Sequence, residues 1–179
     1  MTKKQQSAIQ RIISRDTSRR NFDKRPGDDG FIPGGIHPSD KGYVVTDGMV
    51  AIYFPDKPEG FPDASALPRM SKLILDEWKN GNHILIEQEL PVDEWKQVIR
   101  QQKNTDYPPR ITITVDPLPP SDFNPRLVID AMEAMGAGAM VYIGKTRDHP
   151  SYDTLLVYPK NWMESPDSPL ALVLPYRRT

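Results

Sequence analysis

The chain has 179 residues, a length that suits a single domain with its own hydrophobic core. Hydrophobic residues make up 37% and charged residues 26%, and no apolar run approaches the roughly 20 residues of a membrane span. Because cysteine is absent, disulfides and thiolate metal sites are excluded. The first residues lack the apolar core of a signal peptide, so we expect a cytoplasmic protein with no membrane partner.

The net charge of -1 hides an asymmetry between the two parts of the chain. Residues 1–25 carry a net charge of +6, and the remainder therefore carries -7. A basic arm on an acidic body is one pattern of nucleic-acid binding, and a solvated helix face with a charged tail is the alternative. The basic residues that would contact double-stranded DNA are Lys3, Lys4, Arg11, Arg15, Arg19, Arg20, Lys24 and Arg25.

In the first third, apolar spacing predicts a short helix over 5–15. The glycine- and proline-containing stretch 19–41 predicts a loop, with a short strand at 30–33 as an option. β-forming residues then predict strands at 42–47 and 49–54. Asp47-Gly48 between them indicates a tight hairpin, and one strand with a bulge at Gly48 is the alternative.

The middle third alternates between proline-rich loops and short elements. After a loop over 55–70, residues 71–79 predict a helix with Leu73, Ile74 and Trp78 facing inward. Residues 83–89 predict a strand. Residues 91–102 predict a second helix, and 110–115 alternate as a half-buried strand does.

The last third begins with a helix that has clear start and stop signals. Asn124 suits the N-cap and Pro125 the first helical position, while Phe123 and Val128 have the spacing of a hydrophobic staple. Gly136 supplies the stop. Strands are predicted at 139–144, 154–158 and 170–175. Strands that follow one another in runs favour an α+β fold, with a mixed or antiparallel sheet and helices packed on one face.

Few residues point to a reaction. His37, His83 and His149 do not stand at metal-ligand spacing, and no phosphate-binding or nucleophile motif occurs. Aspartate is favoured in tight turns, and this explains Asp47 without a catalytic or metal-binding role. We therefore expect no catalytic residue, no metal and no cofactor. An enzyme or small-ligand binder with Asp47, His37 or His149 near a pocket is kept as an alternative.

Three segments together are similar to a known family. Residues 45–48 read Val-Thr-Asp-Gly, residues 123–132 read Phe-Asn-Pro-Arg-Leu-Val-Ile-Asp-Ala-Met, and residues 172–177 read Leu-Val-Leu-Pro-Tyr-Arg. They resemble, in order, the Thr-Asp-Gly signature, the second helix and the C-terminal strand of a domain of the bacterial sliding clamp, the beta subunit of the replicative DNA polymerase.

The resemblance implies a single clamp-like domain over 1–179, in which 55–110 is a poorly matching insertion or rebuilt segment. It implies a non-catalytic protein that can form a homo-oligomer. The expected ligands are DNA, a short peptide of a polymerase or repair protein, or both. By residue matching, the peptide groove consists of Thr46, Gly48, Met49, Val50, Leu172, Leu174, Pro175 and Tyr176.

A second alternative is a protein-interaction adaptor of phage or mobile-element type that does not bind DNA. In that case Trp162 and Met163, in the loop before the last strand, would anchor the partner.

Overall fold

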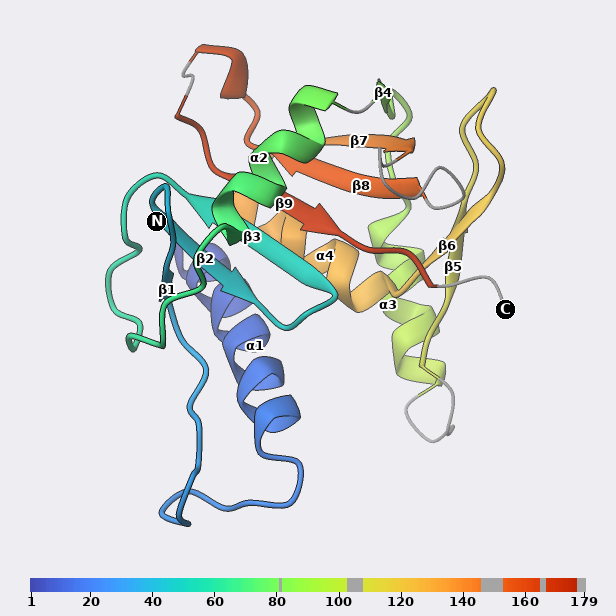
Figure 1. Cartoon of the computed structure of the whole chain (residues 1–179). Helices are drawn as coiled ribbons and strands as arrows, with labels where there is room; N and C mark the ends of the chain where they lie inside the picture. Colours follow the sequence, from blue (N-terminus) through green and yellow to red (C-terminus); the bar gives the residue numbers. More distant parts are fainter. Residues whose placement is uncertain (81, 103–107, 146–152, 165–166, 177–179) are drawn as a thin grey trace.

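The computed structural model describes residues 1–80, 82–102, 108–145, 153–164 and 167–176, with the side chains of 77–80, 145 and 164 set aside (Figure 1). Its helices are α1 (Lys3–Arg20), α2 (Met70–Asn80), α3 (Val92–Gln101), α4 (Pro125–Met135) and the short 3-10 helix η1 (Trp162–Glu164). Its strands are β1 (His37–Pro38), β2 (Tyr43–Thr46), β3 (Val50–Phe54), β4 (Asn82–Leu85), β5 (Ile111–Ile113), β6 (Ser121–Phe123), β7 (Met140–Lys145), β8 (Asp153–Tyr158) and β9 (Leu170–Val173).

One antiparallel sheet organises the chain. Its strand order is β1-β2-β3-β9-β8-β7-β4, and β5 and β6 form a separate two-stranded sheet. The predicted α+β class is therefore confirmed. α1 and α4 pack together on one face of the large sheet, as expected. α2 differs, because Ile74 packs with Tyr53, Tyr142 and Leu170 on the opposite face (Figure 1).

The same order of elements occurs twice along the chain. α1 is followed by β1, β2 and β3, and α4 is followed by β7, β8 and β9. The two units meet where β3 pairs with β9, with Ile52 opposite Ala171 and Val50 opposite Val173. Because the sequence shows no repeat of fixed period, this duplication is visible only in the topology. It places the end of β9 beside the hairpin of β2 and β3.

The hydrophobic core has two layers, one on each face of the sheet. Ile9 and Ile12 of α1 and Val128 of α4 lie fully buried against Ile52 and Leu155. On the other face, Trp162 stacks on Tyr158 with ring centroids 4.3 Å apart, and Tyr142 meets Tyr158 edge to face. Trp162 is thus part of the second layer.

Capping interactions explain where α1 begins and where α4 begins and ends. Thr2 and Gln5 form a capping box at the start of α1, in which each side chain accepts a hydrogen bond from the other's backbone N–H. The Asn124 side chain accepts from Arg126 N at the start of α4, and Gly136 ends that helix with φ 99°. These start and stop signals were predicted for α4, but the cap at Thr2 was not.

Several predicted boundaries differ from the structure. α1 runs five residues further than predicted because Asp16, on its buried side, accepts hydrogen bonds from Arg19 and Arg20 in its last turn. The optional strand at 30–33 is absent from the described chain, and β1 forms instead at 37–38, beside β2.

The other differences concern faces and pairing. The alternative of a bulged single strand at Gly48 is wrong, since β2 and β3 form a hairpin. Leu73 was expected to face inward but is 62% exposed, and the side chain of Trp78 lies outside the described residues. β6 was not predicted, because its pairing with β5 supplies the order that its sequence lacks.

No helix among the described residues is both long and apolar enough to cross a lipid bilayer.

Candidate functional site

The turn between β2 and β3 is fixed by its own side chains. Asp47 Oδ1 accepts hydrogen bonds from Met49 N and Val50 N, both at 3.0 Å. Thr46 Oγ1 donates to Val50 O and accepts from Gly48 N. Gly48 has φ 89°, a conformation that L side chains rarely adopt, and the Arg19 guanidinium lies where its Cβ would be. This chemistry makes the Thr-Asp-Gly segment a rigid turn.

A ladder of ion pairs joins this turn to both helices. Arg15 Nε donates to Asp47 Oδ2 at 2.6 Å, and Arg15 Nη1 donates to Asp130 Oδ2 at 2.5 Å. Arg11 continues the ladder through Asp130 Oδ1 and Glu133 Oε2, each at 2.6 Å. Asp130 is 3% exposed. The ladder therefore positions the hairpin turn relative to α1 and α4.

The end of β9 lies directly beside this turn. Leu174 N donates to Met49 O at 2.9 Å. Met49 is 38% exposed and Leu174 is 37% exposed, so two apolar side chains next to each other reach solvent. Leu172, Pro175 and Tyr176 are half-buried around them. We call Met49, Leu172, Leu174, Pro175 and Tyr176 the docking patch.

Tyr176 closes one end of the docking patch and is held from several sides. Its backbone N donates to Asp122 O at 2.8 Å, and its hydroxyl donates to Pro109 O at 3.1 Å. The Arg110 guanidinium lies 5.0 Å from the ring centroid, within reach of a cation–π interaction. Burial raises the pKa of the Tyr176 phenol, while Arg110 and Asn124 oppose that shift. The phenol is therefore a neutral hydrogen-bond donor around pH 7.

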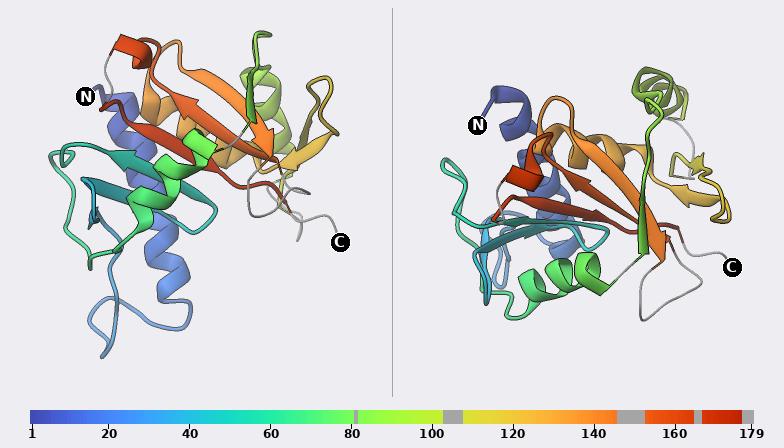
Figure 2. Two further views of the ribbon diagram at one scale, coloured as in Figure 1. Left: turned by 45° about the horizontal axis from the view of Figure 1, so that its top comes forward. Right: turned by 90° about the horizontal axis from the view of Figure 1, so that it is seen from above.

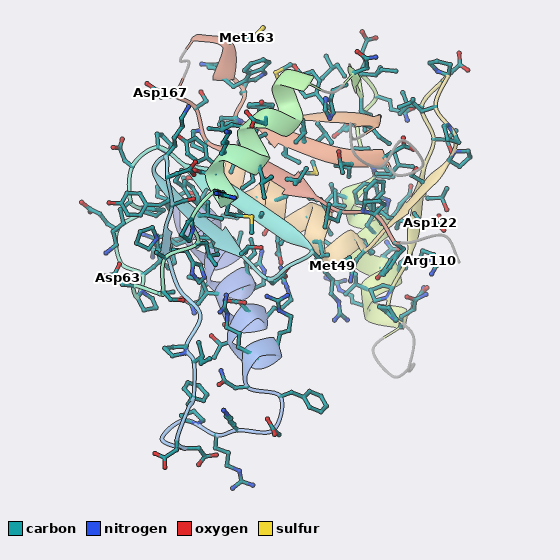
Figure 3. The ribbon with its side chains drawn as sticks, in the orientation of Figure 1. Met49, Asp63, Arg110, Asp122, Met163 and Asp167 are labelled. Carbon is teal, nitrogen blue, oxygen red and sulfur yellow. The ribbon has the colours of Figure 1, made fainter. Side chains whose placement is uncertain are left out.

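Figure 3 shows Met49, Arg110 and Asp122 on one side of the molecule, with Met163 and Asp167 in another region. Arg110 directly precedes β5 and Asp122 lies in β6, and Arg110 Nη1 is 3.4 Å from Asp122 Oδ2. The sequence analysis did not assign either residue to the site. No signal in the sequence marks them, since only the pairing of β5 with β6 brings them to Tyr176.

The eight residues predicted for the peptide groove lie on the β2–β3 hairpin and on β9 with the residues that follow it, which are neighbours because β3 pairs with β9. Five of them form the docking patch. Thr46 and Val50 are buried behind the surface, and Gly48 is exposed but has no side chain, with the Arg19 guanidinium beside it. Their contribution is to support the patch rather than to touch a ligand with their side chains.

The eight residues predicted to contact DNA have different environments. Arg11 and Arg15 belong to the ion-pair ladder, and Lys4 Nζ lies 3.5 Å from Glu133. Arg19 and Arg20 both donate to Asp16, and Lys24 Nζ donates to Gly30 O. Lys3 and Arg25 are exposed. Most of the basic charge of 1–25 is therefore matched by acidic side chains of the same chain.

Two residues of the enzyme alternative, Asp47 and His37, do not line the 1090 Å³ groove beside α4. The third, His149, lies outside the described residues. His37 is buried, with Nδ1 2.6 Å from Ser65 O. In the described part of the chain, no three His, Asp or Glu side chains gather closely enough to hold a metal ion.

No model of a known protein family, no curated protein and no solved structure matches this chain. The class of the protein is therefore given by its geometry alone. It is an α+β chain with a duplicated helix–strand–strand–strand unit and an apolar patch where the two units meet.

Proposed function

We propose that the chain is a non-catalytic, clamp-like docking module whose docking patch receives a short apolar segment of a DNA replication or repair protein. The observation that carries this proposal is the hydrogen bond from Leu174 N to Met49 O. It joins the Thr-Asp-Gly turn and the terminal Leu-Pro-Tyr segment, the two stretches on which the resemblance to sliding clamps places the peptide groove.

The environment of the docking patch supports peptide docking. Exposed Met and Leu beside a half-buried Tyr offer adaptable apolar contact area next to a polar edge. The turn behind the patch is fixed by Asp47 and Arg15, so a ligand need not order it on binding. Preorganised apolar surfaces of this kind suit short linear segments.

The ion-pair ladder favours peptide docking over DNA binding as the main function. Arg11 and Arg15 would have to leave Asp130, Asp47 and Glu133 in order to neutralise phosphates. DNA binding needs several such free charges, because its affinity comes mainly from counterion release. We therefore treat contact with double-stranded DNA as a secondary proposal that rests on the exposed Lys3, Lys24 and Arg25.

A peptide-binding experiment tests the proposal. A fluorescent peptide with the apolar linear motif by which polymerases dock to sliding clamps is titrated with the chain, and anisotropy gives the Kd. Leu174→Asp and Tyr176→Ala each remove contact area, so we expect each to raise the Kd by about tenfold or more.

The matched control is Met163→Asp, since Met163 is 76% exposed and lies away from the patch (Figure 3). It should leave the Kd unchanged. Absence of saturable binding to the unaltered chain would contradict the proposal. A loss caused by Met163→Asp alone would instead favour the adaptor whose anchors are Trp162 and Met163.

A further inference from the structure

A second surface, on elements other than those of the docking patch, carries a groove. It is a groove of about 1090 Å³ between the C-terminal part of α4, the start of β7 and the segment that links β4 to α3. Figure 2 shows α3 beside α4, next to the edge of the sheet that β4 forms. The volume is slightly above the roughly 300–1,000 Å³ of typical ligand pockets, so the groove can hold several side chains.

The floor of the groove is apolar. Ile86, Ile129 and Val141 present their remaining exposed surface there, and Met132 of α4 is half-buried among them. Ile86 N donates to Val141 O, which fixes the linking segment against β7. An unbranched Met on such a floor can adapt to differently shaped apolar side chains.

The rim of the groove is acidic. Glu87, Glu89, Asp93 and Glu94 line it, and all four are exposed. Within the described residues, only Asp93 of these four has an ion pair, a 3.5 Å contact with Lys96. The one basic residue of the lining, Lys4, already pairs with Glu133 at 3.5 Å. The rim thus carries an excess of negative charge above an apolar floor.

We propose that this groove binds a basic amphipathic segment of a partner protein. Its apolar side chains would cover Met132 and Ile129, and its Lys or Arg side chains would meet Glu87, Glu89 and Glu94. The contact of Lys4 with Glu133 is an example of this pairing within the chain itself. The acidic rim requires a segment of positive charge, because the charges of the two surfaces must be complementary. The apolar floor requires that the segment also have an apolar face.

The groove and the docking patch are separate sites. Tyr176 of the patch bonds to Asp122, just before α4 begins, whereas the groove is lined by Gly136 and Ala137, just after α4 ends. An 11-residue helix is roughly 16 Å long, so the two surfaces lie at opposite ends of it. The groove therefore makes the chain able to hold two partner segments at once.

The test uses a labelled peptide of roughly 14 residues, with leucine and lysine at helical spacing and both ends blocked. The full chain is titrated into this peptide at low salt. We expect saturable binding that falls as salt rises. The variant Glu87→Gln/Glu89→Gln/Glu94→Gln should weaken it roughly tenfold, because three exposed charge contacts are lost. The matched control Asp28→Asn/Asp29→Asn/Asp63→Asn removes the same charge from exposed residues outside the groove and should weaken it less than twofold.

Two further peptides test the chemistry of the occupant. Replacing every lysine by glutamate should abolish binding, and replacing every leucine by serine should weaken it at least tenfold. Equal losses in the groove variant and in its control would overturn the proposal, as would full affinity of the serine peptide. Loss on Leu174→Asp with full binding by the groove variant would also overturn it, and would assign the peptide to the docking patch. Failure of this proposal is thus distinguishable from failure of the docking patch.

Discussion

Asp130 lies on α4 and is the point where the ion-pair ladder is most deeply buried. Its two carboxylate oxygens accept hydrogen bonds from Arg11 and Arg15, which reach over from α1. A buried carboxylate without such partners would be strongly destabilising. At the scale of single residues, the stability of the helix pair therefore depends on charge matching as much as on apolar contact.

The Asp130→Asn substitution tests this dependence. It keeps the shape of the side chain but leaves Arg11 and Arg15 with one anionic partner fewer, and both arginines are partly solvated. We expect the free energy of unfolding to fall by about 1–3 kcal/mol, measured by urea denaturation. Asp63→Asn is the control, because Asp63 pairs with Lys57 at 2.6 Å on the surface and should cost about 0–1 kcal/mol. Equal costs would show that burial of the ladder is unimportant.

At the scale of elements, β3 and β9 form the centre of the large sheet and join the two helix–strand–strand–strand units. Ile52 of β3 is fully buried and lies opposite Ala171 of β9. Its face of the sheet is the one that α1 and α4 cover. Packing at this seam therefore determines whether the hairpin turn and the end of β9, and with them the docking patch, come together.

Truncation of Ile52 to alanine should leave a cavity under α1 and α4. We expect a loss of about 2–5 kcal/mol in the free energy of unfolding, with an unchanged denaturant m-value. Leu73→Ala on the exposed side of α2 should stay within about 0.5 kcal/mol of the unaltered chain. If the Ile52 variant were as stable as the Leu73 variant, the seam would not be the structural centre inferred here.

At the scale of the whole molecule, the basic charge of 1–25 is largely compensated by the fold. Asp16, Asp47, Asp130 and Glu133 together pair with five of its eight basic residues, namely Lys4, Arg11, Arg15, Arg19 and Arg20. The formal net charge of -1 then gives little general attraction to phosphate. Within 1–25, DNA binding would have to come from Lys3, Lys24 and Arg25, which are exposed and have no acidic partner among the described residues.

A titration of a fluorescent DNA duplex at several salt concentrations checks this. We expect weak binding without sequence preference, with a slope of log K against log salt of about -3, since Lys3, Lys24 and Arg25 are the exposed basic residues of 1–25 that have no acidic partner among the described residues. Changing these three residues to glutamine should abolish it, and Arg126→Gln on α4 is the single-charge control. A much steeper slope would mean that the ion-pair ladder opens to bind phosphate. No binding even at low salt would contradict the DNA proposal.

The predictions from sequence succeeded where short-range chemistry decides the structure. Asn124, Pro125 and Gly136 marked the ends of α4, and Asp47-Gly48 marked the β2–β3 hairpin. The predictions were incomplete where pairing between strands, rather than local sequence, determines the structure. β1 and β6 are very short strands whose sequences carry little signal, and each exists because a neighbouring strand supplies its hydrogen bonds. Leu73 was misplaced because the helix spacing allowed two faces.

For the candidate site too, the residues could be found from the sequence but their contacts could not. Its members were found by residue matching to a family, but their mutual contact depends on β9 pairing with β3, which no local pattern specifies. In the fold α1 covers Asp130 of α4, a contact that no local pattern specifies either. Pairing and burial of this kind depend on the complete strand order and on which helices share a face.

The sequence by itself determined the α+β class, the ends of α4, the turn at Gly48 and the absence of a thiolate or nucleophile motif. These follow from backbone preferences and side-chain chemistry that act within a few residues. Only the tertiary structure decided that Met49 lies beside Leu174, that Arg11 and Arg15 pair with Asp130, and that an acidic groove forms next to α4. The physical reason is that contacts such as Arg15 with Asp130, 115 positions apart, exist only after the whole sheet has formed.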